Sequence, residues 1–217
     1  MTDGHIHFTR SDIQDLDRIK RLNLINSITG IKPANLIGTI SKDGRSNLAI
    51  FSSVIHLGSN PPLIGMVLRP TGEVPRHTYE NIQQLGTYTI NHIHQTFIER
   101  AHYTSAKFEE ISEFDACGLT EEYLEGFEAP FVKESELKLG LKHVQSIPIE
   151  LNGTILVIGE IQHLIVPERA IDQSGQLDLS SVADVGISGL NRYYALKKLA
   201  EYPYVRVSEL PDWEKRK

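Results

Sequence analysis

The sequence predicts a mainly β protein, a β-barrel accompanied by a few helices. Asp43-Gly44 and Asn152-Gly153 each stand between apolar runs, and both dipeptides favour the tight turn of a β-hairpin. The compact apolar run Leu63–Leu68 follows Asn60-Pro61-Pro62 and has the length of a buried strand. We therefore expect several short strands that pair through hairpins around one core.

Length and composition bound what the protein can be. A chain of 217 residues can bury one sizeable core, so we expect one domain with terminal extensions. It carries 22 lysines and arginines against 28 aspartates and glutamates, a net charge of −6, without a basic cluster. We therefore expect no nucleic acid and no anionic membrane as a partner.

The cysteine count and the hydropathy pattern favour a reducing compartment. Cys117 is the only cysteine, which leaves no intramolecular disulfide, cysteine-based metal cluster or two-cysteine redox motif. The first residues are polar and lack a signal-peptide core, and no apolar run is long enough to span a bilayer. We expect a cytoplasmic protein.

The first 30 residues are expected to form a helical extension. From Ser11 to Asn26 apolar residues recur at three-residue steps, as in an amphipathic helix, with Ser11 or Asp12 as its cap. His5 and His7 have no carboxylate or cysteine partners nearby, so we predict no metal site there. Residues 201–217 are expected to be a tail.

Two β-like runs, Ala34–Ile40 and Ser46–Phe51, flank the Asp43-Gly44 turn. Their pairing would place the segment from Asn47 to Ser53, NLAIFSS, at the end of an ordered strand. This segment is rich in small and hydroxyl residues, so its successive backbone N–H groups can turn toward an anion as a nest. It forms one half of a predicted phosphate site.

The other half of the predicted phosphate site is a helix start at Arg76-His77-Thr78. Thr78 is the expected N-cap, Tyr79–Leu85 the helical run and Gly86 the stop. A helix start offers unpaired N–H donors and the positive end of the dipole, and the arginine adds a full charge. Arg69, at the end of the preceding strand, can point toward the same ligand. Surface positions for both arginines, and a capping role for the histidine, are the alternatives.

The rest of the chain is expected to add strands and one irregular segment. The expected elements are a strand over Thr87–Ile93, a helical region over Gln95–Ser112, an irregular acidic insertion over Asp115–Leu141, two barrel strands over Lys142–Leu151 and Thr154–Glu160, and a continuation or third strand over Ile161–Val166. The insertion would be exposed in part and is where substrate preference could lie.

Two further patterns suggest chemistry. His92 and His94 would share one face of a strand, but no third ligand is evident nearby, so we predict no metal site. Ser135-Glu136-Leu137-Lys138 matches a Ser-x-x-Lys nucleophile motif without any companion motif, and we ascribe the match to chance.

The order and spacing of four motifs resemble the flavin reductase-like family, whose members bind FMN in a split β-barrel of Greek-key type. The motifs are NLAIFSS, SNPPLIGMVLRP, RHTYENI and TYTINHI, and the resemblance runs from about Pro33 to Tyr194. It implies a domain over residues 31–200, between the N-terminal extension of residues 1–30 and the tail. It also implies a homodimer with the flavin near the subunit interface.

The resemblance also implies which residues hold the flavin and its phosphate. These are Asn47, Leu48, Ala49, Ile50, Phe51, Ser52, Ser53, Thr78 and Asn81. We add Arg69, Arg76 and His77 to the candidate residues because of their place at the predicted phosphate site. The segment Gly186–Tyr194 resembles the family's C-terminal motif, but Gly189-Leu190 stands where two glycines are usual. We therefore expect Tyr193 and Tyr194 to be packing residues.

The chain has no Gly-x-Gly-x-x-Gly motif and no Walker loop. The leading hypothesis is an FMN-dependent oxidoreductase that resembles NAD(P)H:flavin reductases, in which hydride passes from the nicotinamide to the flavin. The flavin carries that chemistry, so we name no catalytic side chain. The alternatives are a non-enzymatic FMN-binding electron-transfer protein and a split-barrel binder of another cofactor such as haem, for which the clustered histidines would matter.

Overall fold

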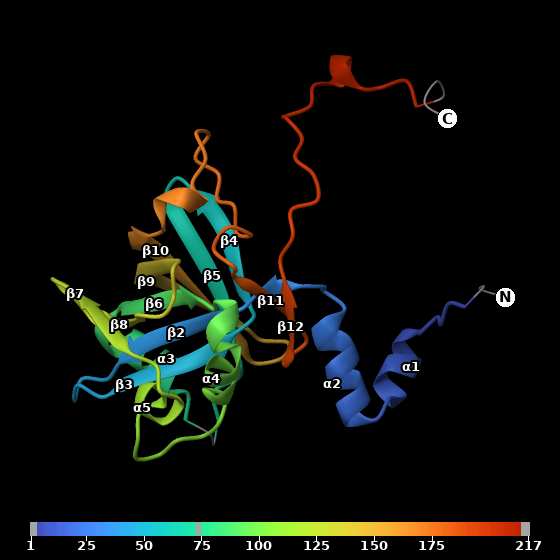
Figure 1. Cartoon of the computed structure of the whole chain (residues 1–217). Helices are drawn as coiled ribbons and strands as arrows, with labels where there is room; N and C mark the ends of the chain where they lie inside the picture. Colours follow the sequence, from blue (N-terminus) through green and yellow to red (C-terminus); the bar gives the residue numbers. More distant parts are fainter. Residues whose placement is uncertain (1–3, 73–74, 214–217) are drawn as a thin grey trace.

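A computed structural model describes residues 4–72 and 75–213 of the chain. Its largest element is an antiparallel sheet of seven strands in the spatial order β3-β2-β6-β9-β10-β5-β4. In chain order these strands are β2 (Asn35–Ile40), β3 (Ser46–Phe51), β4 (Val54–Ser59), β5 (Pro62–Leu68), β6 (Thr87–His92), β9 (Lys138–Ile149) and β10 (Thr154–Ile165). The sheet curls without closing, because β3 and β4 remain its edges (Figure 1). The predicted mainly β split barrel is confirmed.

Smaller elements cover the barrel. Two further sheets are formed by β1 (Lys32–Pro33), β11 (Val185–Ser188) and β12 (Arg192–Ala195), and by β7 (Glu121–Leu124) and β8 (Phe127–Val132). The helices are α1 (Arg10–Asp15), α2 (Arg18–Ser27), α3 (His77–Leu85), α4 (Ile98–Tyr103) and α5 (Glu113–Cys117). Three short 3-10 turns complete the described chain: η1 (Gln95–Phe97), η2 (Glu168–Ala170) and η3 (Val207–Glu209).

Both predicted hairpin turns are present. Gly44 (φ +80°) lies between β2 and β3, and Gly153 (φ +71°) lies between β9 and β10. A positive φ is strained for residues with a Cβ, so glycine is the residue that makes each turn without cost. The first hairpin places Asn47 directly opposite Thr39.

The core lies on both faces of the sheet around β2. Successive residues of β2 point to opposite sides: Ile37 packs with Met66 and Ile90 inside the barrel, whereas Leu36 packs with Phe97 and Phe114 outside it. Helix α3 contributes Ile82 to the inner cluster, and α4 and α5 cover the outer one. Strand β2 therefore reads as a continuous buried run without alternation.

The single N-terminal helix that we predicted is wrong, because two helices occupy this segment. Leu16 adopts an extended conformation (ψ 143°) after α1, and the Asp17 side chain starts α2 by accepting hydrogen bonds from the N–H groups of Ile19 and Lys20. Thr9, and neither Ser11 nor Asp12, is the N-cap of α1. Neither helix buries a residue in its own chain.

Two predictions downstream of β6 are also wrong. The helical region over Gln95–Ser112 is limited to η1 and α4, because the hydroxyls of Thr104 and Ser105 bond back to carbonyls of the last turn and end it. Asp115–Leu141 is no irregular insertion. Its hairpin β7–β8 turns at Gly126 (φ +77°) and buries Phe127 and Phe131.

Strand β4 lies in a segment to which the sequence assigned no strand, and it forms one edge of the sheet. Its side chains are mostly exposed, so it lacks the buried face that makes a strand visible in a sequence. At the other extreme, β9 begins four residues earlier than predicted, and the two runs Thr154–Glu160 and Ile161–Val166 merge into the single long strand β10. In the described chain, no helix is long and apolar enough to cross a membrane.

Candidate functional site

A buried polar cluster joins helix α3 to the β2–β3 hairpin. The Asn47 amide donates hydrogen bonds to the hydroxyls of Thr78 (3.1 Å) and Thr39 (3.2 Å). The Asn81 amide donates to the same Thr39 hydroxyl (3.1 Å), and all four side chains are buried. We call these four residues the polar clamp. Buried hydrogen bonds of this kind fix an element in place, because leaving any of these groups unpaired would be costly.

The polar clamp corrects the predicted role of Thr78. Arg76 occupies the N-cap position of α3, and among the described residues no side chain caps the helix. Thr78 instead turns its hydroxyl inward to Asn47. The helix ends as predicted at Gly86, which has a left-handed conformation (φ 75°).

The first turn of α3 has free donors. The first backbone bond of the helix runs from the Glu80 N–H to the Arg76 carbonyl (2.9 Å). Within the described residues, the N–H groups of His77, Thr78 and Tyr79 have no acceptor. Such donors and the helix dipole together favour an anion.

Arg76 is held beside this helix start. Its Nε donates to the Pro70 carbonyl (3.2 Å), and its backbone N–H donates to the Glu80 carboxylate (3.0 Å). Arg69 directly precedes that proline in the chain and is exposed. A guanidinium next to free helical N–H groups can bind a phosphate by charge and by geometry.

A hollow of about 110 Å³ opens beside the polar clamp and brings together three predicted residues, Asn47, His77 and Asn81. Its other lining residues are Ser41, Arg45, Ser46, Phe108 and Glu113, none of which we predicted. Glu113 is buried and accepts a hydrogen bond from the Leu48 N–H (3.0 Å), which ties α5 to β3. The sequence signal that could have pointed to Glu113 is Ser112, which directly precedes it. Serine is a favoured N-cap residue, and Ser112 caps the helix α5 that Glu113 begins.

Strand β3 presents backbone groups at a free edge of the sheet. Leu48 donates its N–H away from β2, to Glu113. Because residues two apart in a strand face the same way, the backbone of Ile50 also points outward. The Leu48 side chain is fully buried in the outer cluster and its N–H is bonded to Glu113, so only its carbonyl is left to contact a ligand.

The two serines lie at the far end of β3. The Ser53 hydroxyl donates to the Val67 carbonyl (2.7 Å), which joins this segment to β5, and Ser52 is half-buried. Four residues of extended chain lie between Asn47 and Ser52, and the five steps span roughly 17 Å at the rise of a strand. A single phosphate cannot touch both residues, so a site that included all of the predicted residues would be elongated.

The remaining predicted residues have other partners. The His92 imidazole lies 2.8 Å from the buried Asp184 carboxylate, and His94 Nδ1 accepts from the Thr96 N–H (3.2 Å) at the start of η1. In the described parts of the chain, no three His, Cys, Asp or Glu side chains are placed to hold a metal. The two histidines therefore have separate partners in the structure.

The C-terminal motif packs on the outer cluster in part. The Tyr193 hydroxyl lies 2.9 Å from His102 Nδ1, and burial raises the pKa of Tyr193 to about 12. Tyr194, by contrast, is 41% exposed. Tyr193 is thus a packing residue as predicted, and Tyr194 is a surface residue.

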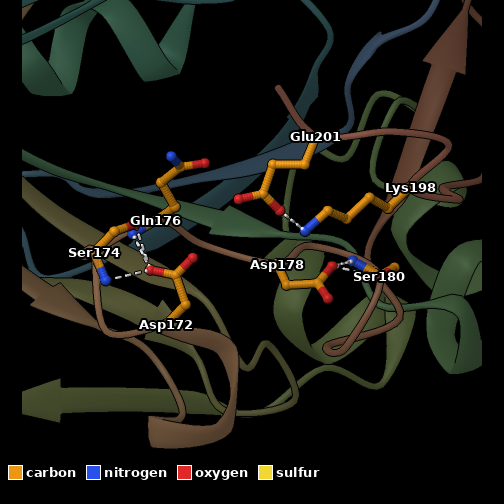
Figure 2. Close-up of polar contacts among 7 residues, drawn as sticks. All are labelled: Asp172, Ser174, Gln176, Asp178, Ser180, Lys198 and Glu201. Carbon is orange, nitrogen blue, oxygen red and sulfur yellow. Dashed lines mark hydrogen bonds and ion pairs between the residues drawn. The ribbon is translucent and has the colours of Figure 1, made fainter. Parts of the chain in front are cut away.

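A second hollow, of about 360 Å³, lies between the loop around residues 172–180 and the chain after β12. Figure 2 shows its charged side chains. Hydrogen bonds from Ser174 and Ser180 lower the pKa of Asp172 and Asp178, respectively, and Glu201 raises the pKa of Lys198. These charges are satisfied by their neighbours, and we assign no ligand to this hollow.

The model of the family described as "Flavin reductase like domain" matches residues 31–178, more than half of the chain and all of the candidate residues. The chain therefore belongs to the flavin reductase-like family. It is a split-barrel protein of a flavin-binding class.

Solved structures agree with this assignment. A proposed flavin reductase with a split barrel domain from Shewanella frigidimarina is 51% identical, with a TM-score of 0.89, over 93% of this chain and all of that chain. Flavoredoxin of Desulfovibrio vulgaris is 27% identical, with a TM-score of 0.69, over 80% of this chain and 91% of its own. Component B of nitrilotriacetate monooxygenase from Bacillus cereus, at 18% identity and a TM-score of 0.81 over 93% of this chain and all of that chain, shows the same fold.

Proposed function

We propose that the protein is an FMN-dependent oxidoreductase that takes hydride from NAD(P)H. The single observation that carries the phosphate end of this proposal is the uncapped first turn of α3, whose free N–H groups lie beside Arg76. A phosphate monoester is the anion that distinguishes FMN from riboflavin, and an open helix start with an adjacent guanidinium suits it. Membership of the flavin reductase-like family supports the flavin part.

In this proposal each part of the elongated site has one task. The N–H groups of His77 and Thr78, with Arg76, bind the phosphate, and Arg69 adds positive charge nearby. The polar clamp fixes the helix start relative to β3. Without the polar clamp, the distance between the phosphate donors and the free edge of the sheet would not be fixed.

The flavin ring would lie along the edge of β3 at the outward-facing backbone of Ile50, with Ala49, Phe51 and Ser52 as its neighbours in the chain. Outward-facing N–H and C=O groups there match the hydrogen-bonding edge of the ring. When bound, FMN supplies the hydride chemistry, and this chain's groups bind and orient it. Backbone N–H donors toward that edge would stabilise the negative charge of the reduced ring.

The biological setting is part of the same proposal. We take residues 31–200 as the flavin-binding domain, residues 1–30 as an N-terminal extension and residues 201–217 as a tail. We propose a homodimer located in the cytoplasm, with NAD(P)H as the reductant. The net charge of −6 and the lack of an internal basic cluster in the sequence support the proposal that nucleic acid is not a partner.

A second candidate is an electron carrier that binds FMN without oxidising NAD(P)H. The likeness to a flavoredoxin is the observation that favours it. Both candidates use the same site, so they differ only in what reduces the flavin.

The test is the visible spectrum of the purified protein after addition of FMN and then of NADH or NADPH under anaerobic conditions. A reductase shows bound-flavin absorbance that bleaches with either nucleotide. A carrier shows the same absorbance, unchanged by both nucleotides and bleached by dithionite. Absence of bound FMN at micromolar concentrations would contradict both.

A further inference from the structure

The C-terminal arm, Leu196–Trp213, leaves the barrel after β12 and runs away from its own sheet (Figure 1). Its large apolar side chains face solvent: Tyr204 is 91% exposed, Leu199 88% and Val207 86%. The arm is extended apart from the short turn η3, in which the Arg206 N–H donates to the Glu209 carboxylate (3.0 Å). Residues 196–198, 200 and 201 of the arm still line the hollow beside residues 172–180, and beyond them apolar side chains lie exposed along an extended segment.

The composition of the arm differs from that of a disordered tail. Tails that stay unfolded are poor in apolar residues and rich in net charge. The arm carries Leu199, Tyr202, Tyr204, Val205, Val207, Leu210 and Trp213. Its three cations, at 197, 198 and 206, balance its three anions, at 201, 209 and 212. A neutral segment with several aromatic residues has the composition of a binding segment.

The same chain exposes an apolar surface that such a segment could cover. Side chains from two strands meet over Gly65 of β5: Leu57 and Leu156 lie 3.0 and 3.1 Å, and Ile55 3.3 Å, from the point where a Cβ on Gly65 would stand. Ile147 on β9 pairs with Leu156 and is also exposed. We call Ile55, Leu57, Ile147 and Leu156 the outer patch.

The outer patch lies next to an open edge of the sheet. Strand β4, which carries Ile55 and Leu57, is the last strand in the seven-stranded order. An exposed edge strand with apolar side chains invites pairing with another extended segment, and the arm has that conformation. Gly65 leaves room in this surface, because a Cβ at that position would contact the side chains of Leu57, Leu156 and Ile55.

We propose that the C-terminal arm of one chain packs over the outer patch of a second copy, and that the exchange is reciprocal. Each chain carries both the C-terminal arm and the outer patch. In a dimer with two-fold symmetry, each arm would therefore cover the patch of the other chain. Fully extended, a segment of this length would reach at most about 60 Å. We base this on the proposed assembly of two chains, independently of the proposed cofactor.

The arm contains its own probe, since Trp213 is the only tryptophan in the chain. Emission wavelength and acrylamide quenching of the full-length protein, measured without flavin over a dilution series, report whether the arm is covered. Sedimentation velocity on the same samples reports the number of chains. The expected result is a two-chain particle with shielded, blue-shifted tryptophan, and quenching that rises about threefold or more as the particle dissociates.

Matched variants locate the contact. Leu57→Glu, on the outer patch, should weaken association at least about tenfold and expose Trp213 at the concentration where the parent is dimeric. Tyr204→Ser in the arm should act in the same direction, and it cannot disturb the barrel. Leu151→Glu, at the exposed tip of the β9–β10 turn and off the patch, is the control and should change neither reading. Far-UV circular dichroism checks that each variant is folded.

Two results would overturn the inference while leaving the proposed flavin site untouched. A dimer whose tryptophan is quenched as strongly as in urea has uncovered arms. A tryptophan that stays shielded after dissociation into single chains belongs to an arm folded on its own barrel. A particle that is monomeric at all concentrations would overturn the proposed assembly, and the exchange with it.

Discussion

The amide of Asn47 on β3 donates a 3.1 Å hydrogen bond to the hydroxyl of Thr78 on α3. These residues are 31 positions apart, and the bond is buried. It joins the free edge of the sheet to the open start of the helix. The spacing between the proposed phosphate and ring positions therefore depends on this contact and on its neighbour through Thr39.

Removing the Thr78 hydroxyl should cost both stability and ligand affinity. Thr78→Val keeps the shape but leaves the Asn47 amide without this acceptor, so we expect the free energy of unfolding to fall by about 1–3 kcal/mol. Thr78→Ser should keep most of it. Denaturant unfolding of the two variants beside Thr71→Val, an exposed threonine, measures the effect. Equal stability of the valine and serine variants would contradict a role for the hydroxyl.

Tyr88 and Gly159 should show a coupled effect in the barrel interior. The buried Tyr88 hydroxyl has no hydrogen-bond partner in the described chain, and burial raises its pKa. A Cβ on Gly159 would stand 2.2 Å from this hydroxyl. Gly159→Ala should therefore destabilise by about 1–3 kcal/mol, as overpacking does.

Tyr88→Phe should be neutral or stabilising, since it removes an unsatisfied buried group. In the double variant, phenylalanine should recover only part of the loss caused by alanine, because the ring carbons Cζ and Cε1 would still stand 2.9 and 3.0 Å from the new Cβ. A double-mutant cycle from thermal or denaturant unfolding measures this coupling. Strict additivity would show that the hydroxyl and the new methyl do not meet.

Cys117 should react slowly in the native protein. Burial, and the nearby Glu113 carboxylate, raise the pKa of its thiol. A raised pKa means less thiolate at pH 8, and the thiolate is the nucleophile. Reaction with a thiol reagent such as DTNB should be slow under native conditions and fast in urea, with one thiol per chain. Equal rates in both would place the side chain on the surface.

Glu113 should matter for the attachment of α5 to β3. Its carboxylate accepts the Leu48 N–H, and its side chain lines the hollow beside the polar clamp. Glu113→Ala leaves that N–H unpaired, so we expect a loss of about 1–3 kcal/mol. Glu110→Ala, on an exposed residue of the same segment, is the control and should change stability little. Hydrogen exchange at Leu48 should quicken in the first variant alone.

The sequence predicted those elements whose signals are local. The turns at Gly44 and Gly153 need a positive φ, and the dipeptides Asp-Gly and Asn-Gly predict such a turn. The helix stop at Gly86 has the same cause. Strand β4 escaped prediction because it is an edge, where one face of a strand need not be apolar.

The contacts that define the site could not be predicted in this way. Threonine is a favoured N-cap residue, but the Thr78 hydroxyl accepts a hydrogen bond from Asn47, 31 residues earlier. This tertiary contact overrides the local preference. Glu113 and Arg45 join the hollow only because α5 folds back onto β3. The order of the four sequence motifs nevertheless identified the family, because that order depends on the arrangement of the whole barrel and not on a single contact.

The central claim is that the start of α3 binds a phosphate, and the affinities for FMN and riboflavin test it most directly. Isothermal titration should show that the parent protein prefers FMN, and that Arg76→Ala weakens FMN binding about tenfold or more, as expected for loss of a charge-assisted contact. Riboflavin binding should stay unchanged, and Lys133→Ala, an exposed cation elsewhere, should change neither. Equal affinities of the parent for FMN and riboflavin, or an equal loss for both ligands in Arg76→Ala, would contradict the claim.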